Sequence, residues 1–141
     1  MSFSFSNFFK SDKPKPSEVN IPKIEFGGGT KYASNNENDM YLDFEELGGF
    51  PFIKTIIIGR FNTATKRTGC ELSFILKNEI LKLQSDKNDI ESTEIKNSKV
   101  YFTEIDFELN DEDLKKINNN LVNEIVYTFK NKKIHFLPID L

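Results

Sequence analysis

The two side chains best suited to nucleophilic chemistry are Cys70 and His135, the only cysteine and the only histidine of the chain. A thiolate activated by a neighbouring imidazole can carry out acyl transfer. Cys70 alternates with Leu72 and Phe74, however, and a free cysteine on an apolar face is usually a small buried hydrophobic group. We therefore expect a non-catalytic protein. A small enzyme with carboxylate chemistry is a weaker alternative, because only the fold decides which acidic residues meet.

The sequence predicts neither a metal site nor a cofactor. One cysteine and one histidine cannot supply the set of nitrogen and sulfur ligands that zinc requires. The run Gly27-Gly28-Gly29, followed closely by Lys31, resembles a phosphate-binding loop in composition only. Such loops lead directly into a helix, and the residues after this run have no helical period.

Residues 59–69 form the most interesting polar stretch. They contain Arg60, Phe61, Lys66 and Arg67 between two predicted strands, and we expect a hairpin there. A basic hairpin with an aromatic residue can bind single-stranded nucleic acid through backbone charge and base stacking. A net charge of −3 and the lack of a broad basic face favour a solvated tip or a protein contact. Nucleic-acid binding therefore stays as an alternative function.

Residues 1–20 are predicted to be an appendage of the domain. Phe5, Phe8 and Phe9 are interleaved with polar residues, and the alternating lysines and prolines of residues 13–16 give a stiff, extended link. Such a segment either folds back as an extra strand or adds to a partner's groove or sheet edge. We expect these three phenylalanines to be anchors for a partner.

The leading functional prediction is a protein–protein interaction or assembly module, such as a component of a larger complex, that binds a protein partner or a second copy of itself. The single cysteine cannot form an internal disulfide, which is typical of a reducing compartment and predicts a cytoplasmic protein. The longest aliphatic run, Ile56 to Ile58, is too short to span a bilayer.

Alternating apolar and polar residues predict most of the elements of the globular domain, residues 21–141. Residues 50–61 are apolar on both faces and predict a central strand. In residues 100–109 mostly apolar residues alternate with acidic ones, which predicts a half-exposed strand. Residues 70–76 predict the strand that returns from the hairpin, extended to Leu83 past a bulge.

A long helix is predicted near the C-terminus. Asn110 is a candidate N-cap, and three acidic residues follow it in the first turn, where they favour the positive end of the helix dipole. Apolar residues three or four apart, among them Ile117, Leu121 and Ile125, form a stripe along one face of a helix. The stripe predicts a helix over about residues 111–130.

These elements together predict an α+β fold. We expect a mainly antiparallel sheet of about five to seven strands, the long helix packed on it, and a final short strand over residues 133–139.

Overall fold

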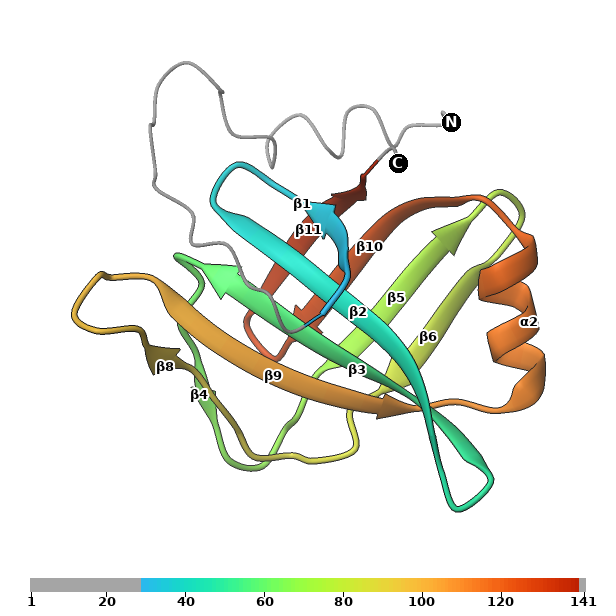
Figure 1. Ribbon diagram of the computed structural model, residues 1–141, viewed down its shortest axis with the longest axis horizontal. Coiled ribbons are helices and arrows are strands. Elements are labelled where there is room, and N and C mark those ends of the chain that lie inside the picture. The colour runs from blue at the N-terminus through green and yellow to red at the C-terminus, as the bar shows by residue number, and fades with distance from the viewer. Residues whose placement is uncertain (1–28, 140–141) are drawn as a thin grey trace.

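The computed structural model describes residues 29–139. Nine antiparallel strands form one sheet that curls into a half-barrel, and a separate ribbon pairs two short strands (Figure 1). The elements in chain order are β1 Lys31–Ser34, β2 Asn38–Leu47, β3 Phe50–Gly59, β4 Ala64–Thr65, β5 Glu71–Leu76, β6 Ile80–Gln84, β7 Ile90–Glu91, β8 Thr93–Glu94, β9 Tyr101–Glu108, α2 Asp111–Asn119, β10 Val122–Phe129 and β11 Lys132–Pro138.

The predicted α+β class is wrong, because the fold is mainly β and α2 is the one helix among residues 29–139. The predicted helix over residues 111–130 is two elements, the short helix α2 and the strand β10. Three consecutive asparagines, residues 118–120, weaken the helix at the junction. The residues that follow are rich in β-branched and aromatic side chains, which pack well on a pleated sheet.

The start of the helix was predicted correctly. Asn110 is the N-cap, and its side-chain oxygen accepts a hydrogen bond from the Asp113 backbone N–H at 2.8 Å. The Asp113 carboxylate in turn accepts a hydrogen bond from the Asn110 backbone N–H, and the two bonds form a capping box. The buried side chain of α2 is Ile117, so the helix covers one end of the core with a narrow apolar face.

The strand order is β6-β5-β10-β11-β1-β2-β3-β9-β8. The predicted central strand is confirmed, because β3 pairs with β2 along its whole length and with β9 on its other side. The predicted final strand, β11, is also confirmed, but it lies in the interior of the sheet between β10 and β1. The curl brings β6 back towards β9, where Ser85 bridges Phe107 and the Asp86 N–H donates to the Asp106 carbonyl at 2.8 Å.

The predicted hairpin over residues 59–69 is not a hairpin, because β3 and β5 do not pair. The connection between them instead crosses the curled sheet and contributes β4, which pairs with β7. The extension of β5 past a bulge is also wrong. A turn at residues 77–79 reverses the chain, and β6 pairs back onto β5 in a hairpin.

One large apolar core fills the concave side of the sheet. The largest of its fully buried members come from strands across the sheet and are Met40, Ile53, Ile57, Leu72, Phe74, Phe107, Ile125, Tyr127 and Phe136. The acidic residues of β9 point to the opposite, convex side, as their alternation with Thr103, Ile105 and Phe107 predicted. A smaller cluster on the convex side of β2, β3 and β9 is covered by the loop that carries Ile95 and Val100.

Candidate functional site

The tip of the β2–β3 hairpin exposes an unusual amount of apolar surface. Gly48 and Gly49 form its two-residue turn with φ of +60° and +85°, the signs that a type I′ turn requires. The residues on either side, Leu47 and Phe50, are 75% and 74% exposed. Phe44, further along β2, is also exposed, but it pairs with Ile53 and so lies on the opposite face of the hairpin. Large apolar side chains gathered at one exposed place mark an interaction site more often than single ones do.

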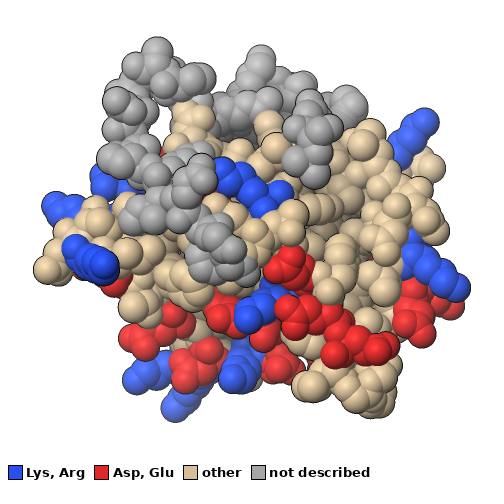
Figure 2. Space-filling model, viewed as in Figure 1, with Lys and Arg blue, Asp and Glu red and all other residues tan. Residues whose placement is uncertain are grey.

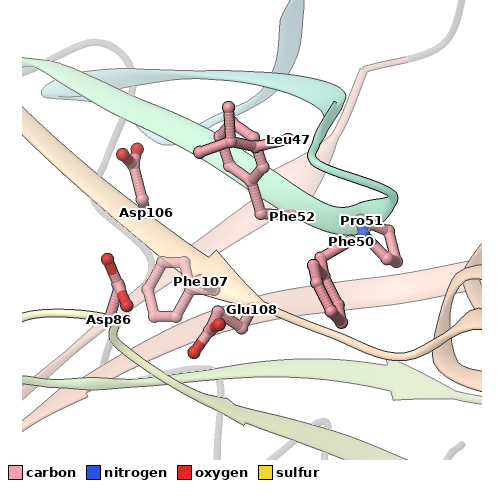
Figure 3. A pocket seen from close by; sticks show the side chains of 8 residues that line it. All are labelled: Leu47, Phe50, Pro51, Phe52, Asp86, Asp106, Phe107 and Glu108. Atoms are coloured by element: carbon pink, nitrogen blue, oxygen red, sulfur yellow. The ribbon is translucent and has the colours of Figure 1, made fainter.

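A hollow of about 290 Å³ lies at the base of this tip. The residues that line it come from the hairpin, from β9 and from the turn after β6, and are Leu47, Phe50, Pro51, Phe52, Asp86, Asp106, Phe107 and Glu108. Figure 3 shows the carboxyl groups of Asp86, Asp106 and Glu108 around Phe107, opposite the apolar side chains of the hairpin. The hollow therefore offers an apolar wall and an acidic wall.

Strand register explains why acidic groups surround the hollow. Phe52 lies between Glu45 on β2 and Glu108 on β9, with all three side chains on the convex face. Two residues further along β3, Lys54 lies on the same face between Asp43 on β2 and Asp106 on β9. In Figure 2 acidic side chains form a band over β2 and β9 that reaches the uncharged tip of the hairpin at the lower right.

Asp106 is partly buried and lies among charged side chains. Loss of solvent raises its pKa, as do the carboxylates of Glu104 and Asp86, while Lys54 acts in the opposite direction. Lys54 also pairs with Glu104 at 3.6 Å. The Oδ1 atom of Asp106 is buried and has no hydrogen-bond partner among residues 29–139. A cationic or N–H donor that reached this oxygen would relieve both the desolvation and the mutual repulsion.

The basic residues predicted from residues 59–69 remain at the surface, but their aromatic neighbour does not. Arg60, Lys66 and Arg67 are exposed, whereas Phe61 is 8% exposed. The Phe61 ring packs on Phe129 with the centroids 5.2 Å apart. Base stacking on Phe61, which the sequence suggested, is therefore not available in this conformation. The predicted anchors of the appendage, Phe5, Phe8 and Phe9, lie outside the described residues.

Sequence reasoning missed a second basic segment. The turn between β10 and β11 contributes Lys130 and Lys132, and together with residues 63–68 it lines a hollow of about 530 Å³. In the sequence these lysines lie at and just beyond the end of the helix predicted over residues 111–130. Only the long-range pairing of β10 with β5 brings them to the connection after β3.

The candidate nucleophile and base are not assembled. Cys70 is buried in the core, where desolvation and the nearby Glu71 carboxylate raise the pKa of the thiol to about 12. His135 instead contacts Glu124, with Nδ1 2.8 Å from Oε2. Lys31, which follows the glycine run, belongs to β1 and pairs with Asp39 at 3.4 Å.

Within residues 29–139, no group of three or more His, Cys, Asp or Glu side chains is arranged to hold a metal ion. In the same part of the chain, no helix has the length and apolar character needed to cross a membrane. No known protein family, curated protein or solved structure matches this chain.

Proposed function

We propose that the chain is a non-catalytic protein-interaction module that docks a partner at the β2–β3 tip. The observation that supports this proposal most is the joint exposure of Leu47 and Phe50 on a turn of fixed geometry. Fully burying one such side chain contributes about 1.5–3 kcal/mol. Because the turn is already ordered, little further conformational entropy is lost when it is covered.

The composition of the site indicates the kind of partner. An apolar wall with an acidic wall favours a protein segment that carries apolar side chains next to Lys or Arg. Such a cation would offset the desolvation and repulsion at Asp106 that Lys54 and Lys87 leave in place. The lone cysteine, buried and without a disulfide, is consistent with a partner met in a reducing compartment such as the cytoplasm.

Site-specific photo-crosslinking tests the proposal. With Phe50→p-benzoylphenylalanine in the full chain, we expect one dominant adduct, either with a second protein or with another copy. Ile80 is also exposed but lies far from the tip along the sheet, so Ile80→p-benzoylphenylalanine is the matched control. Charge reversal by Glu45→Lys and Glu108→Lys should strongly reduce the Phe50 adduct. Equal adducts at both positions, or an adduct indifferent to charge reversal, would refute docking at the tip.

The appendage carries an independent part of the same prediction. Phe5, Phe8 and Phe9 are expected to anchor a partner, and three buried rings can outweigh the cost of ordering a short peptide. Deletion of residues 1–12 should then abolish association while leaving the thermal midpoint of the domain nearly unchanged. A large loss of thermal stability in a monomeric protein would instead assign these residues to the core.

A further inference from the structure

At the end of β3 opposite the hairpin tip, two basic segments distant in the sequence meet. The Lys132 Nζ donates to the Asn62 carbonyl at 3.3 Å and lies 4.8 Å from the centroid of the Phe61 ring. This cation–π contact and hydrogen bond connect the β10–β11 turn to the connection after β3. The two segments are therefore held at a fixed separation.

Six basic side chains gather here, and all are exposed. They are Arg60, Lys66, Arg67, Lys130, Lys132 and Lys133. None of the six forms an ion pair with a carboxylate of residues 29–139, although Lys31, Lys54 and Lys116 elsewhere do. Two carboxylates lie nearby: Glu91 is across from Ala64 on β7, and Glu37 lines a neighbouring hollow together with Arg60 and Lys133, so the basic residues outnumber the acidic ones. Four of the six, Lys66, Arg67, Lys130 and Lys132, line one hollow. Like charges this close repel one another, and an anionic ligand would reduce that repulsion.

The hollow between the segments is large enough for a phosphate group and has cationic and hydroxyl side chains in its lining. It measures about 530 Å³ and is lined by Thr63, Ala64, Thr65, Lys66, Arg67, Thr68, Phe129, Lys130, Asn131 and Lys132. The hydroxyl groups of Thr65 and Thr68 bond each other at 2.7 Å at its rim. Hydroxyl and amide groups of this kind join Lys and Arg in contacts to phosphate oxygens.

We propose that this hollow, which we call the basic hollow, binds the phosphate backbone of single-stranded nucleic acid. A flexible single strand can bend so that successive phosphates meet both basic segments, whereas a rigid duplex cannot enter a hollow of this volume. Phe61 and Phe129 are both buried, so base stacking contributes little and binding is independent of sequence. The site is separate from the β2–β3 tip and does not depend on the function proposed for that tip.

Fluorescence anisotropy with a labelled oligothymidylate tests the proposal on the full chain. Binding should be strong at low salt and should weaken steeply between about 50 mM and about 200 mM salt. For single strands the slope of log K against log salt is about −0.7 for each phosphate neutralised. The variant Lys130→Ala with Lys132→Ala should therefore lower the magnitude of the slope by about 1.4. Lys66→Ala with Arg67→Ala should do the same from the other side of the hollow.

A control variant removes the same charge elsewhere. Lys77 and Lys115 are exposed near the opposite end of the molecule, so Lys77→Ala with Lys115→Ala should leave the slope unchanged. Lys130→Arg with Lys132→Arg retains the charge and should retain binding. Circular dichroism and thermal midpoints should show that all these variants fold equally well.

Three results would overturn the proposal. The first is no binding of the oligothymidylate at low salt. The second is a loss of affinity in the control variant equal to that in the two test variants. The third is equal or tighter binding of a DNA duplex or of polyglutamate, which would make the basic hollow a duplex surface or a site for acidic protein.

Discussion

Tyr127 has the largest side chain among the fully buried residues. Its apolar ring is in an apolar environment, whereas its polar hydroxyl is buried there too. The ring packs against Phe136 and Phe107, with centroids 5.7 Å and 6.2 Å away. The hydroxyl is buried and has no partner at hydrogen-bond geometry among residues 29–139; the Thr55 hydroxyl, which interacts with it weakly, donates its own proton to the Ile105 carbonyl at 2.7 Å. A buried polar group without a hydrogen-bond partner lowers the stability of the fold, whereas burial of the apolar surface of the ring raises it.

We therefore expect Tyr127→Phe to leave the free energy of unfolding unchanged or to raise it by up to about 1 kcal/mol. Urea denaturation of the variant and the wild-type chain measures the difference. A loss of more than about 1 kcal/mol would mean that the hydroxyl makes a stabilising hydrogen bond.

The Cys70 thiol predicts a loss of stability in alkaline solution. Burial, and secondarily Glu71, raise its pKa from 9.0 to about 12 in the folded protein. The unfolded chain therefore loses this proton at a lower pH than the folded chain. The stabilisation is complete below about pH 9 and declines as the pH rises towards about 12.

The difference between the wild-type chain and Cys70→Ala isolates this effect from other groups that titrate at high pH. Denaturation at about pH 8 and about pH 11 should show a smaller decrease for Cys70→Ala. Thiol reagents should label the native protein slowly and the denatured protein quickly. Rapid labelling of the folded chain, or equal decreases for both proteins, would place the thiol in contact with solvent.

At the scale of elements, the end of α2 makes a sharp prediction about two apolar residues. Ile117 is buried in the core, whereas Leu121, in the break before β10, is 77% exposed. Ile117→Ala should cost about 2–5 kcal/mol, and Leu121→Ala should cost less than about 0.5 kcal/mol. The midpoints of urea denaturation give both values. A large loss of stability in Leu121→Ala would mean that Leu121 is buried, as in the continuous helix predicted over residues 111–130.

The same stripe shows why the start of α2 could be predicted and its end could not. The cap at Asn110 and the acids after it have a local cause, and the capping box confirms them. Ile117, Leu121 and Ile125 fit a helical period, but Ile125 also fits the period-two pattern of β10, whose Tyr127 and Phe129 are buried in the same core. Over so short a window both periods match, and tertiary pairing decides between them.

Strand pairing over long distances was the other unpredictable part. The local hairpin at Gly48 and Gly49 follows from turn chemistry, but four strands separate β5 from β3, onto which it was expected to return. The basic residues Lys66 and Arg67 were recognised in sequence. Lys130 and Lys132 could not be added to them, because their proximity depends on where β10 and β11 lie in the sheet.

The whole molecule has its weakest connection where the curled sheet meets itself. β2 and β3 pair over ten residues, whereas the contact between β6 and β9 rests on the Ser85–Phe107 bridge and the Asp86 amide. Regions with few backbone hydrogen bonds open without global unfolding. The half-barrel should therefore open along this seam first.

Native-state hydrogen exchange tests this expectation. The Asp86 amide should exchange through local opening with a free energy well below that of the Ile57 and Tyr127 amides, which lie in interior strands of the sheet. Asp86→Pro removes the N–H that donates across the seam, and it should lower protection of the neighbouring amides at the ends of β6 and β9 more than around Ile57. Equal protection at all three amides would mean that the sheet opens only as one cooperative unit.

The position of β11 has a consequence for how a nascent chain acquires this fold. β11 is the last strand of the sheet to be synthesised, yet it joins β10 to β1, and the Ile139 amide extends that junction by donating to the Tyr32 carbonyl at 3.0 Å. Until the ribosome has released it, β10 and β1 are both open edges, which are templates for wrong pairing. The curled sheet therefore closes only once β11 is available, and a chain stalled or truncated before β11 would be a substrate for chaperones and proteases.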